Sequence, residues 1–311
     1  MQNNFITSKP VRQYLKAKRY NVALAESLRR LGDRRWATVA NCSQALGVKY
    51  CAQCGVKHVD VSWCCRHRLC STCAIRRSRK TGKQALDAFE HMRATGQLDG
   101  CHLSLLTLTQ RNVDAADLAA ELDALLSALA SIRHTADARK YLIGSARNVE
   151  ITYNARMRTY HPHVHIILIL APEAPAEMDT IQYWRDLWRR LMNLNYDPIC
   201  DIRPIVGEEG AICEVSKYVI KPSSIFGLNL DAAHLDQVVA ALNSVLAGRR
   251  LVSFTGIWRK ARLALKQQDP DTDLEHDDTS DICGCGAALM DAVLRWDGLQ
   301  YSPDCGQALF I

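Results

Sequence analysis

The stretch that decides the fold is ARNVEITYNARMRTYHPHVHIILIL, residues 146–170. It contains two apolar runs rich in β-forming residues, 146–153 and 161–170, separated by the turn-like segment NARMRT. Two such runs around a short polar segment predict an antiparallel β-hairpin. With the turn near 156–158, the numbers of residues opposite each other sum to roughly 313–315.

The second run carries three histidines at alternate positions, His161, His163 and His165. Strand periodicity puts all three imidazoles on one face, which is the outline of a metal site. The register sets Glu150 across from His163 or His165, which makes Glu150 the candidate third ligand. His161 is either a further ligand or only a neighbour of the metal site. The alternative is a strand glutamate without a special role, since a register error of one residue would turn it away. Two histidines and a carboxylate leave coordination positions open and suit Mn²⁺, or Mg²⁺ in cells.

Further along the chain, 211–220 reads as a helix, and the segment EVSKYVIK places four polar residues on one helix face. These are Glu214, Lys217, Tyr218 and Lys221. A phenol between two ammonium groups has its phenolate stabilised, which makes Tyr218 a candidate nucleophile. The alternative is a structural tyrosine of the kind common on helices.

Apolar periodicity predicts the remaining elements around the hairpin. Strands are expected at 102–109, 200–205 and 249–254. Helices are expected in the basic segment 9–48 and at 81–96, 114–134, 181–194 and 232–247.

Thirteen cysteines in a chain without an apolar signal segment favour metal ligation over disulfides. Cys51-x2-Cys54 and Cys70-x2-Cys73, with fifteen residues between the pairs, have the spacing of a four-thiolate zinc site. The ligand set stays open, because further candidates lie in the same stretch and leave room for a second ion. These are His58, Cys64, Cys65 and His67, with Cys65 the first alternative.

A second cysteine group lies near the end of the sequence, beyond an acidic segment. Residues 267–281 hold seven acidic residues and no Lys or Arg, which is typical of a solvated linker. Cys283, Cys285 and Cys305 follow it and are candidates for a second zinc, with His276 as a further ligand.

Charge is distributed unevenly along the chain. Residues 1–80 hold 17 Lys and Arg against 3 Asp and Glu, whereas the whole chain has a net charge of only +6. An excess of this sign and length favours a polyanionic partner. The basic run directly after the last zinc-spaced cysteine is predicted to bind phosphate. It consists of Arg76, Arg77, Arg79 and Lys80.

Three motifs occur here in the order found in a known family. LSLLTLTQRN at 103–112, YHPHVHIIL at 160–168 and EVSKYVIK at 214–221 resemble the motifs of rolling-circle plasmid replication initiators, which are histidine-hydrophobe-histidine endonucleases, here with a single tyrosine. VEITYN before the histidine motif, CRHRLCSTC with RRSRK at 65–80, and RRLVSFTGIWRKA at 249–261 also resemble that family. The resemblance covers about 50–262. It departs at Ser71, where the family usually has a proline, and in the upstream Cys51/Cys54 pair.

The resemblance implies an α+β fold with a central antiparallel sheet flanked by helices and the histidine strand in its middle. Tyr218 would attack a phosphodiester of single-stranded DNA, forming a 5′-phosphotyrosine bond and freeing a 3′-OH for a host polymerase, with a host helicase as a further partner. Mg²⁺ or Mn²⁺ on His163, His165 and Glu150 would polarise the scissile phosphate. Glu214 would be the general base that lets water cleave the closing strand, and Lys217 and Lys221 would hold phosphate or the phenolate.

We expect five segments along the chain, with duplex and single-stranded origin DNA as partners. They are a basic helical region at 1–48, a zinc-binding module at 49–80, the nicking and joining domain at 81–262, the acidic linker at 263–281 and a cysteine-containing tail at 282–311. With no apolar run of 18 residues, a membrane span is excluded and a cytoplasmic location is expected.

Two other functions compete with this interpretation. A transposase or relaxase of a mobile element would use the same nick-and-join chemistry. A zinc-ribbon DNA-binding regulator without catalysis explains the basic N-terminal region, but it explains neither the histidine strand nor the lysine-flanked tyrosine.

Overall fold

A computed structural model of the chain describes residues 9–55, 57–61, 63–205, 212, 216, 219–272, 274 and 281–303. The chain divides into two compact units, each assembled from segments that are distant in the sequence. Unit 1 comprises Met1–Lys80, Asn229–Ala240 and Pro270–Ile311, and unit 2 comprises Thr81–Leu228 and Ala241–Asp269.

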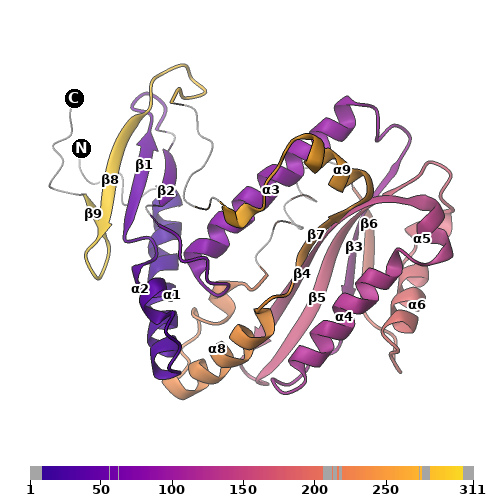
Figure 1. Cartoon of the computed structure of the whole chain (residues 1–311), viewed down its shortest axis with the longest axis horizontal. Helices are drawn as coiled ribbons and strands as arrows, with labels where there is room; N and C mark the ends of the chain where they lie inside the picture. The colour runs from indigo at the N-terminus through magenta and orange to yellow at the C-terminus, as the bar shows by residue number, and fades with distance from the viewer. Residues whose placement is uncertain are drawn as a thin grey trace. The chain divides into compact units, whose positions relative to one another are not determined.

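Unit 2 is built on a five-stranded sheet in the order β6-β3-β5-β4-β7, in which all neighbouring strands are antiparallel (Figure 1). The strands are β3 (His102–Thr109), β4 (Leu142–Asn154), β5 (Thr159–Leu170), β6 (Cys200–Pro204) and β7 (Val252–Thr255). The histidine strand β5 is the central one. This confirms the predicted α+β fold with a central antiparallel sheet and the histidine strand in its middle.

The hairpin β4–β5 has the predicted register. Its turn is closed by Asn154, whose side-chain oxygen accepts hydrogen bonds from the backbone N–H groups of Arg156 and Met157, both at 3.1 Å. Such an asparagine turn mimics a backbone turn and fixes where the strands reverse. The ladder pairs Glu150 directly with His163. Because directly opposed residues of an antiparallel pair share a face, Glu150 lies on the histidine face of the sheet.

The two faces of this sheet are covered by different helices. Helices α4 (Leu118–Ile132) and α6 (Ile181–Leu191) lie on one face, and α3 (Ser71–Ala94) and α9 (Gly256–Ala264) lie on the other (Figure 1). The short helix α5 (Ala136–Tyr141) leads directly into β4, and α8 (Ala232–Leu246) precedes β7.

The face under α3 and α9 changes character along β5. Ile167 and Ile169 belong to a buried apolar cluster with Phe89 of α3 and Trp258 of α9. Toward the hairpin turn the same face carries His161, His163 and His165, which are only partly buried. The apolar half therefore anchors the strand, and the polar half is left to hold a site.

A close approach of two backbone segments fixes where α9 starts. Gly256 has a φ of +57°, and a Cβ atom there would lie 1.9 Å from the backbone oxygen of Ile143 in β4. Only glycine has no side chain to clash at such a position. Gly256 thus lets α9 begin directly against the sheet.

Unit 1 contains a four-stranded antiparallel sheet in the order β2-β1-β8-β9. Its strands are β1 (Ala45–Tyr50), β2 (Lys57–Val61), β8 (Met290–Trp296) and β9 (Tyr301–Pro303). Helices α1 (Lys9–Arg30) and α2 (Trp36–Asn41) precede it. The prediction of helices throughout 9–48 is therefore wrong at its end, because β1 begins at Ala45, where Leu46 and Val48 alternate as buried residues in strand fashion.

The segment predicted as a solvated acidic linker is tied to unit 1 in its described part. Leu274 is 1% exposed, and its carbonyl oxygen accepts a hydrogen bond from Arg76 at 2.7 Å. Asp271 accepts one from Arg77 at 2.6 Å. Among the described residues, no helix is long and apolar enough to cross a membrane.

Candidate active site and cysteine clusters

Three side chains on the histidine face of unit 2 converge on one point. The Nε2 atoms of His163 and His165 lie 3.5 Å and 3.9 Å from Oε2 of Glu150. One ligand atom from each residue falls within 4.8 Å of the others. All three side chains are largely shielded from solvent, at 13–14% exposure. The strand pair places them, since Glu150 and His163 face each other across the ladder and His165 is two positions further along β5.

A hydrogen bond at Nδ1 orients each of the two imidazoles. Nδ1 of His165 lies 3.0 Å from the hydroxyl oxygen of Thr107, which sits opposite it on β3. Nδ1 of His163 lies 3.3 Å from the backbone oxygen of His161. A hydrogen bond at Nδ1 leaves Nε2 as the ligand atom, as in metal-bound histidines generally. Thr107 has no signal in the sequence that marks it, because its role arises only from the β3–β5 pairing.

The donor set fits a small divalent cation that also binds phosphate oxygens. Octahedral Mg²⁺ or Mn²⁺ with bonds of about 2.1 Å spaces adjacent ligands about 3 Å apart, so small side-chain rotations close the observed 3.5–3.9 Å separations. Two imidazoles and one carboxylate occupy half of such a coordination sphere and leave the rest for water or substrate.

His161 stands beside this group rather than within it. Its ring stacks on that of His163 with centroids 5.3 Å apart. Burial, followed by the neighbouring His163, lowers the pKa of His161, so its neutral form is favoured. Among the described residues, the group of convergent ligand atoms comprises Glu150, His163 and His165 without His161.

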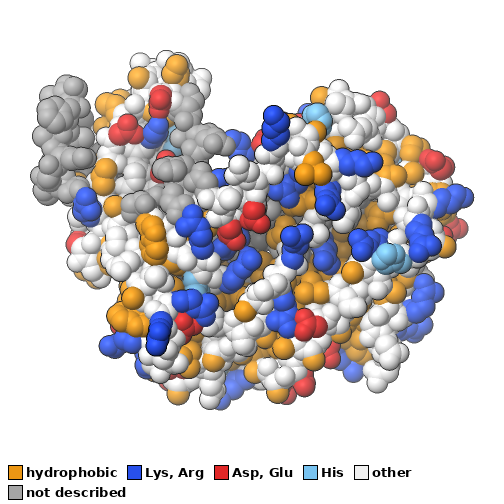
Figure 2. Space-filling view, in the orientation of Figure 1, with side chains coloured by type: hydrophobic (Ala, Val, Ile, Leu, Met, Phe, Trp, Pro, Cys, Tyr) orange, Lys and Arg blue, Asp and Glu red, His pale blue; other side chains and the backbone are white. Residues whose placement is uncertain are grey.

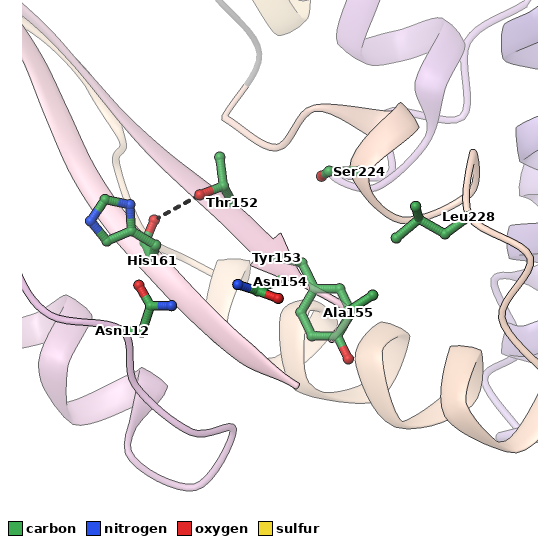
Figure 3. A pocket seen from close by; sticks show the side chains of 8 residues that line it. All are labelled: Asn112, Thr152, Tyr153, Asn154, Ala155, His161, Ser224 and Leu228. Carbon is green, nitrogen blue, oxygen red and sulfur yellow. Dashed lines mark hydrogen bonds between the residues drawn. The ribbon is translucent and has the colours of Figure 1, made fainter. Parts of the chain in front are cut away.

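A cavity of about 510 Å³ opens next to His161 (Figure 3). Its lining comes from the hairpin, from Asn112 beyond the end of β3, and from Ser224 and Leu228. In the close-up, the Asn112 side chain and the His161 ring lie near each other at one end, with Leu228 at the other. Small-molecule sites have volumes of about 300–1,000 Å³, so the cavity is large enough for a nucleotide unit.

A described neighbour of the predicted nucleophile is bound to strand β4 of the hairpin. Glu214, Lys217 and Tyr218 lie outside the described residues, but their neighbours are described. The backbone N–H of Ile151, one residue after Glu150, donates a 2.8 Å hydrogen bond to the carbonyl oxygen of Val219.

Two other described residues, Ile212 and Ser216, lie in the same stretch of the sequence. Ile212 is 5% exposed and belongs to the apolar cluster with Phe89 and Trp258. Ser216 donates its N–H to the carbonyl oxygen of Ile212 at 3.1 Å, the i to i+4 spacing of a helical turn. Lys221, the described member of the predicted catalytic set, is exposed.

The four cysteines predicted to form one zinc site lie in two separate clusters of unit 1. Cys70 and Cys73 converge with Cys65 and Cys42, whereas Cys51 and Cys54 converge elsewhere. We call the first group the inner cluster. Cys65 was predicted as an alternative ligand, but Cys42 was missed, because a single cysteine outside the CxxC pairs carries no spacing signal. Cys305 lies outside the described residues.

The inner cluster has the dimensions of a tetrathiolate zinc site. Sγ of Cys42 lies 3.7 Å from that of Cys73 and 3.5 Å from that of Cys70, and Cys65 lies 3.7 Å from Cys73. Tetrahedral Zn–S bonds of about 2.3 Å space the sulfurs about 3.8 Å apart. Cys42, Cys70 and Cys73 are fully buried.

A buried lysine lies beside the inner cluster. Lys18 is 1% exposed and donates 2.7 Å hydrogen bonds to the carbonyl oxygens of Ala40 and Cys42. Burial lowers its pKa to about 8, against the opposing influence of the thiols of Cys42, Cys70 and Cys65. Four thiolates on Zn²⁺ carry a net charge of −2, and a nearby buried ammonium offsets part of it.

The predicted phosphate-binding run lies on α3, but its members have different environments. Arg76 is 2% exposed and donates to the carbonyl oxygens of Leu274 and Val59 at 2.7 Å and 2.9 Å. A guanidinium buried in this way joins segments of unit 1 and does not present itself to a phosphate, so we leave Arg76 out of any DNA contact. Arg77 is paired with Asp271, and Arg79 is exposed.

Basic side chains also gather over the histidine side of the unit 2 sheet. Figure 2 shows lysine and arginine side chains over the region of α3 and α9, interspersed with few acidic ones. Arg259 and Lys260 on α9 are exposed. These residues belong to the segment 249–261, so a positive surface lies on the same side of the sheet as the candidate metal site.

Comparisons with known proteins assign the chain to a family. A family model described as replication protein matches residues 56–302. A protein rep of Lentilactobacillus hilgardii is 30% identical over 300 residues, which cover 92% of each chain. One from Streptococcus pneumoniae is 30% identical over 210 residues, 65% of this chain and 63% of that protein, and one from Lactiplantibacillus plantarum is 26% identical over 309 residues. No solved structure matches the chain.

Proposed function

We propose that this chain, which belongs to the replication protein family and is a plasmid replication initiator, acts by nicking and rejoining single-stranded origin DNA through Tyr218. The observation that carries the proposal is the convergence of Glu150, His163 and His165, beside which we place Tyr218. The Ile151–Val219 hydrogen bond supports their proximity, because it joins the residue after Glu150 to the residue after Tyr218.

The chemistry is an exchange of one phosphodiester for another. The Tyr218 oxygen attacks the scissile phosphorus and loses its proton, the bond to the 3′-oxygen breaks, and that oxygen leaves as a 3′-OH after taking up a proton. The product is a 5′-phosphotyrosine bond, which conserves the bond energy for rejoining. Lys217 and Lys221 favour the phenolate and hold phosphate oxygens.

Glu150, His163 and His165 would hold Mg²⁺ or Mn²⁺ in this proposal. The bound cation supplies charge stabilisation at the non-bridging phosphate oxygens. Glu150 and the two imidazoles would fix the position of the cation, because all three are carried by rigid strands. The nucleotide next to the scissile phosphate enters the cavity beside His161. Glu214 activates the water that cleaves the closing strand at termination.

Substrate binding is assigned to the basic surfaces. Arg77, Arg79 and Lys80 of unit 1 contact duplex origin DNA, while Arg259 and Lys260 guide the single strand toward the histidine face. The free 3′-OH is then the primer for a host polymerase, with a host helicase opening the duplex. Zn²⁺ occupies the inner cluster as a structural ion.

A strand-transfer assay tests this function. With Mn²⁺, one oligonucleotide containing the nick site and a second that ends in a 3′-OH at the same site should give a joined product without added nucleotide triphosphates. A nuclease that only hydrolyses would yield the cut fragments and no joined strand, which would refute the proposal.

Removing the Thr107 hydroxyl should weaken the metal site without abolishing it. We expect Thr107→Val to raise the Mn²⁺ concentration needed for half-maximal nicking by about 10-fold or more, because the orienting bond to His165 is lost. The rate at saturating Mn²⁺ should stay within about 3-fold of the wild-type rate, since no ligand atom changes.

The matched control is Thr109→Val, in the neighbouring position on the same face. Its hydroxyl donates to the backbone oxygen of Ile199, and it sits opposite His163 without bonding to its ring. Titration of Mn²⁺ against initial nicking rate compares the two variants. Equal Mn²⁺ dependence in both would show that Thr107 does not position His165.

A further inference from the structure

A second group of four cysteines gathers in unit 1 from segments more than 200 positions apart in the sequence. Cys51 and Cys54 meet Cys283 and Cys285, with Sγ–Sγ distances of 3.5 Å between Cys51 and Cys285 and 3.3 Å between Cys54 and Cys283. All four sulfurs lie within 4.8 Å of one another. We call this group the outer cluster.

These sulfurs are spaced for a shared ion rather than for disulfides. A disulfide joins two sulfurs at about 2.05 Å, and each sulfur here has more than one near neighbour. Tetrahedral Zn–S bonds of about 2.3 Å give sulfur separations of about 3.8 Å, close to those observed. All four cysteines are free thiols in the structure.

Both cysteine pairs lie in tight turns, the first closed by an i to i+4 and the second by an i to i+3 backbone hydrogen bond. Cys54 and Cys285 are each followed by a glycine with positive φ, Gly55 at +73° and Gly286 at +87°. The N–H of Gly55 donates to the carbonyl oxygen of Cys51 at 3.0 Å, and the N–H of Gly286 donates to that of Cys283 at 2.8 Å. A turn that reverses after the second cysteine directs both thiols of a pair to one side. The two turns therefore present four sulfurs to a common centre.

The strands bring the two turns together. Cys51 directly follows β1, and the turn leads into β2, while the Cys283 turn precedes β8. Tyr50 pairs with Lys57 on one side of β1 and with Met290 on the other, so both turns lie at the same end of the three strands. This pairing is built from the first and last parts of the described chain and cannot be read from local spacing.

We propose that the outer cluster binds a second structural Zn²⁺ that clamps the strands β8 and β9 to the β1–β2 hairpin. Four thiolates in a tetrahedral arrangement select zinc over the hard cations that suit the histidine site. The ligand set differs from the one predicted for a second zinc, since Cys51 and Cys54 take part. The inference is independent of the nicking function.

The two zinc ions should differ in accessibility. Cys54 and Cys285 are exposed, whereas three ligands of the inner cluster are fully buried. A chelator reaches the outer ion directly, but the inner ion requires unit 1 to open. We therefore expect release in two phases, one zinc per chain quickly and one at least about 10-fold more slowly.

Metal analysis of the full-length, reduced protein tests the site. Wild-type protein should contain two zinc ions per chain, and the Cys283→Ser/Cys285→Ser variant should contain one. The matched control is Cys101→Ser, a partly exposed cysteine of unit 2 outside both clusters, which should keep two. One zinc in the wild type, unchanged in the double variant, would overturn the proposal, as would iron in place of zinc.

A measurement on the unaltered chain covers the case in which the double variant fails to fold. Alkylation followed by mass spectrometry should show Cys51, Cys54, Cys283 and Cys285 protected in the zinc-loaded protein. Brief chelation should expose these four together, while the inner cluster stays protected. Rapid alkylation of exposed Cys54 and Cys285 before chelation, or their recovery in disulfides under reducing conditions, would contradict a bound ion.

Discussion

Replacing His163 by alanine is expected to lower the nicking rate at saturating Mn²⁺ by about 100-fold or more, which corresponds to about 2.7 kcal/mol of transition-state stabilisation. His163 lies directly opposite Glu150, and its Nε2 is 3.5 Å from the carboxylate. Its loss removes one of two nitrogen ligands and leaves Glu150 without its nearest partner. Glu150→Gln should have an effect of similar size, because the amide lacks the charge that holds a divalent cation.

The measurement is the initial rate of cleavage of a labelled single strand, with duplex binding followed by gel mobility shift. His134→Ala is the matched control, since His134 is exposed and lies outside the convergent group. Binding should persist in all three variants, because the proposed duplex contacts belong to unit 1. Normal nicking by His163→Ala would show that this group is not the catalytic metal site.

Replacing Tyr218 by phenylalanine is expected to reduce nicking by at least about 1,000-fold, to the background of the assay. Phenylalanine keeps the aromatic ring but has no oxygen to attack phosphorus. Mn²⁺ binding should be unchanged, because the proposed ligands are on the β4–β5 hairpin.

Tyr141→Phe is the control, since Tyr141 ends α5 and lies outside the proposed site. Both variants are compared by cleavage rate and by the amount of protein–DNA adduct on a denaturing gel. An adduct that survives Tyr218→Phe at the wild-type level would assign the nucleophile to another residue.

Local periodicity was enough to predict the strands that carry the site, whereas their arrangement in one central sheet was implied by the family resemblance. β3 was predicted with its observed bounds. The predicted register placed Glu150 across from His163 or His165, and the structure pairs it with His163. The reason is physical: an alternating strand with one buried face tolerates no slip, since a shift of one residue turns every side chain to the wrong side.

Sequence spacing was insufficient for the cysteine clusters. The CxxC pairs were recognised as metal-binding turns, but which pairs share a centre depends on tertiary pairing, here of β1 with β8. Arg76 was likewise misjudged from its local sequence. Its place in a basic run indicated phosphate binding, but contacts with β2 and Leu274 bury it inside unit 1. Long-range contacts of this kind leave no trace in the spacing of neighbouring residues.

The position of the label in the covalent adduct tests the central claim most directly. Oligonucleotides tiling both strands of the DNA around the gene are incubated with the protein and Mn²⁺, labelled at either the 3′ or the 5′ end. A 5′-phosphotyrosine retains the 3′ part of the strand, so we predict protein-linked label from one 3′-labelled oligonucleotide, dependent on Mn²⁺ and mapping to the peptide that contains Tyr218. Label transferred from the 5′ end, or no adduct with any strand, would contradict the account.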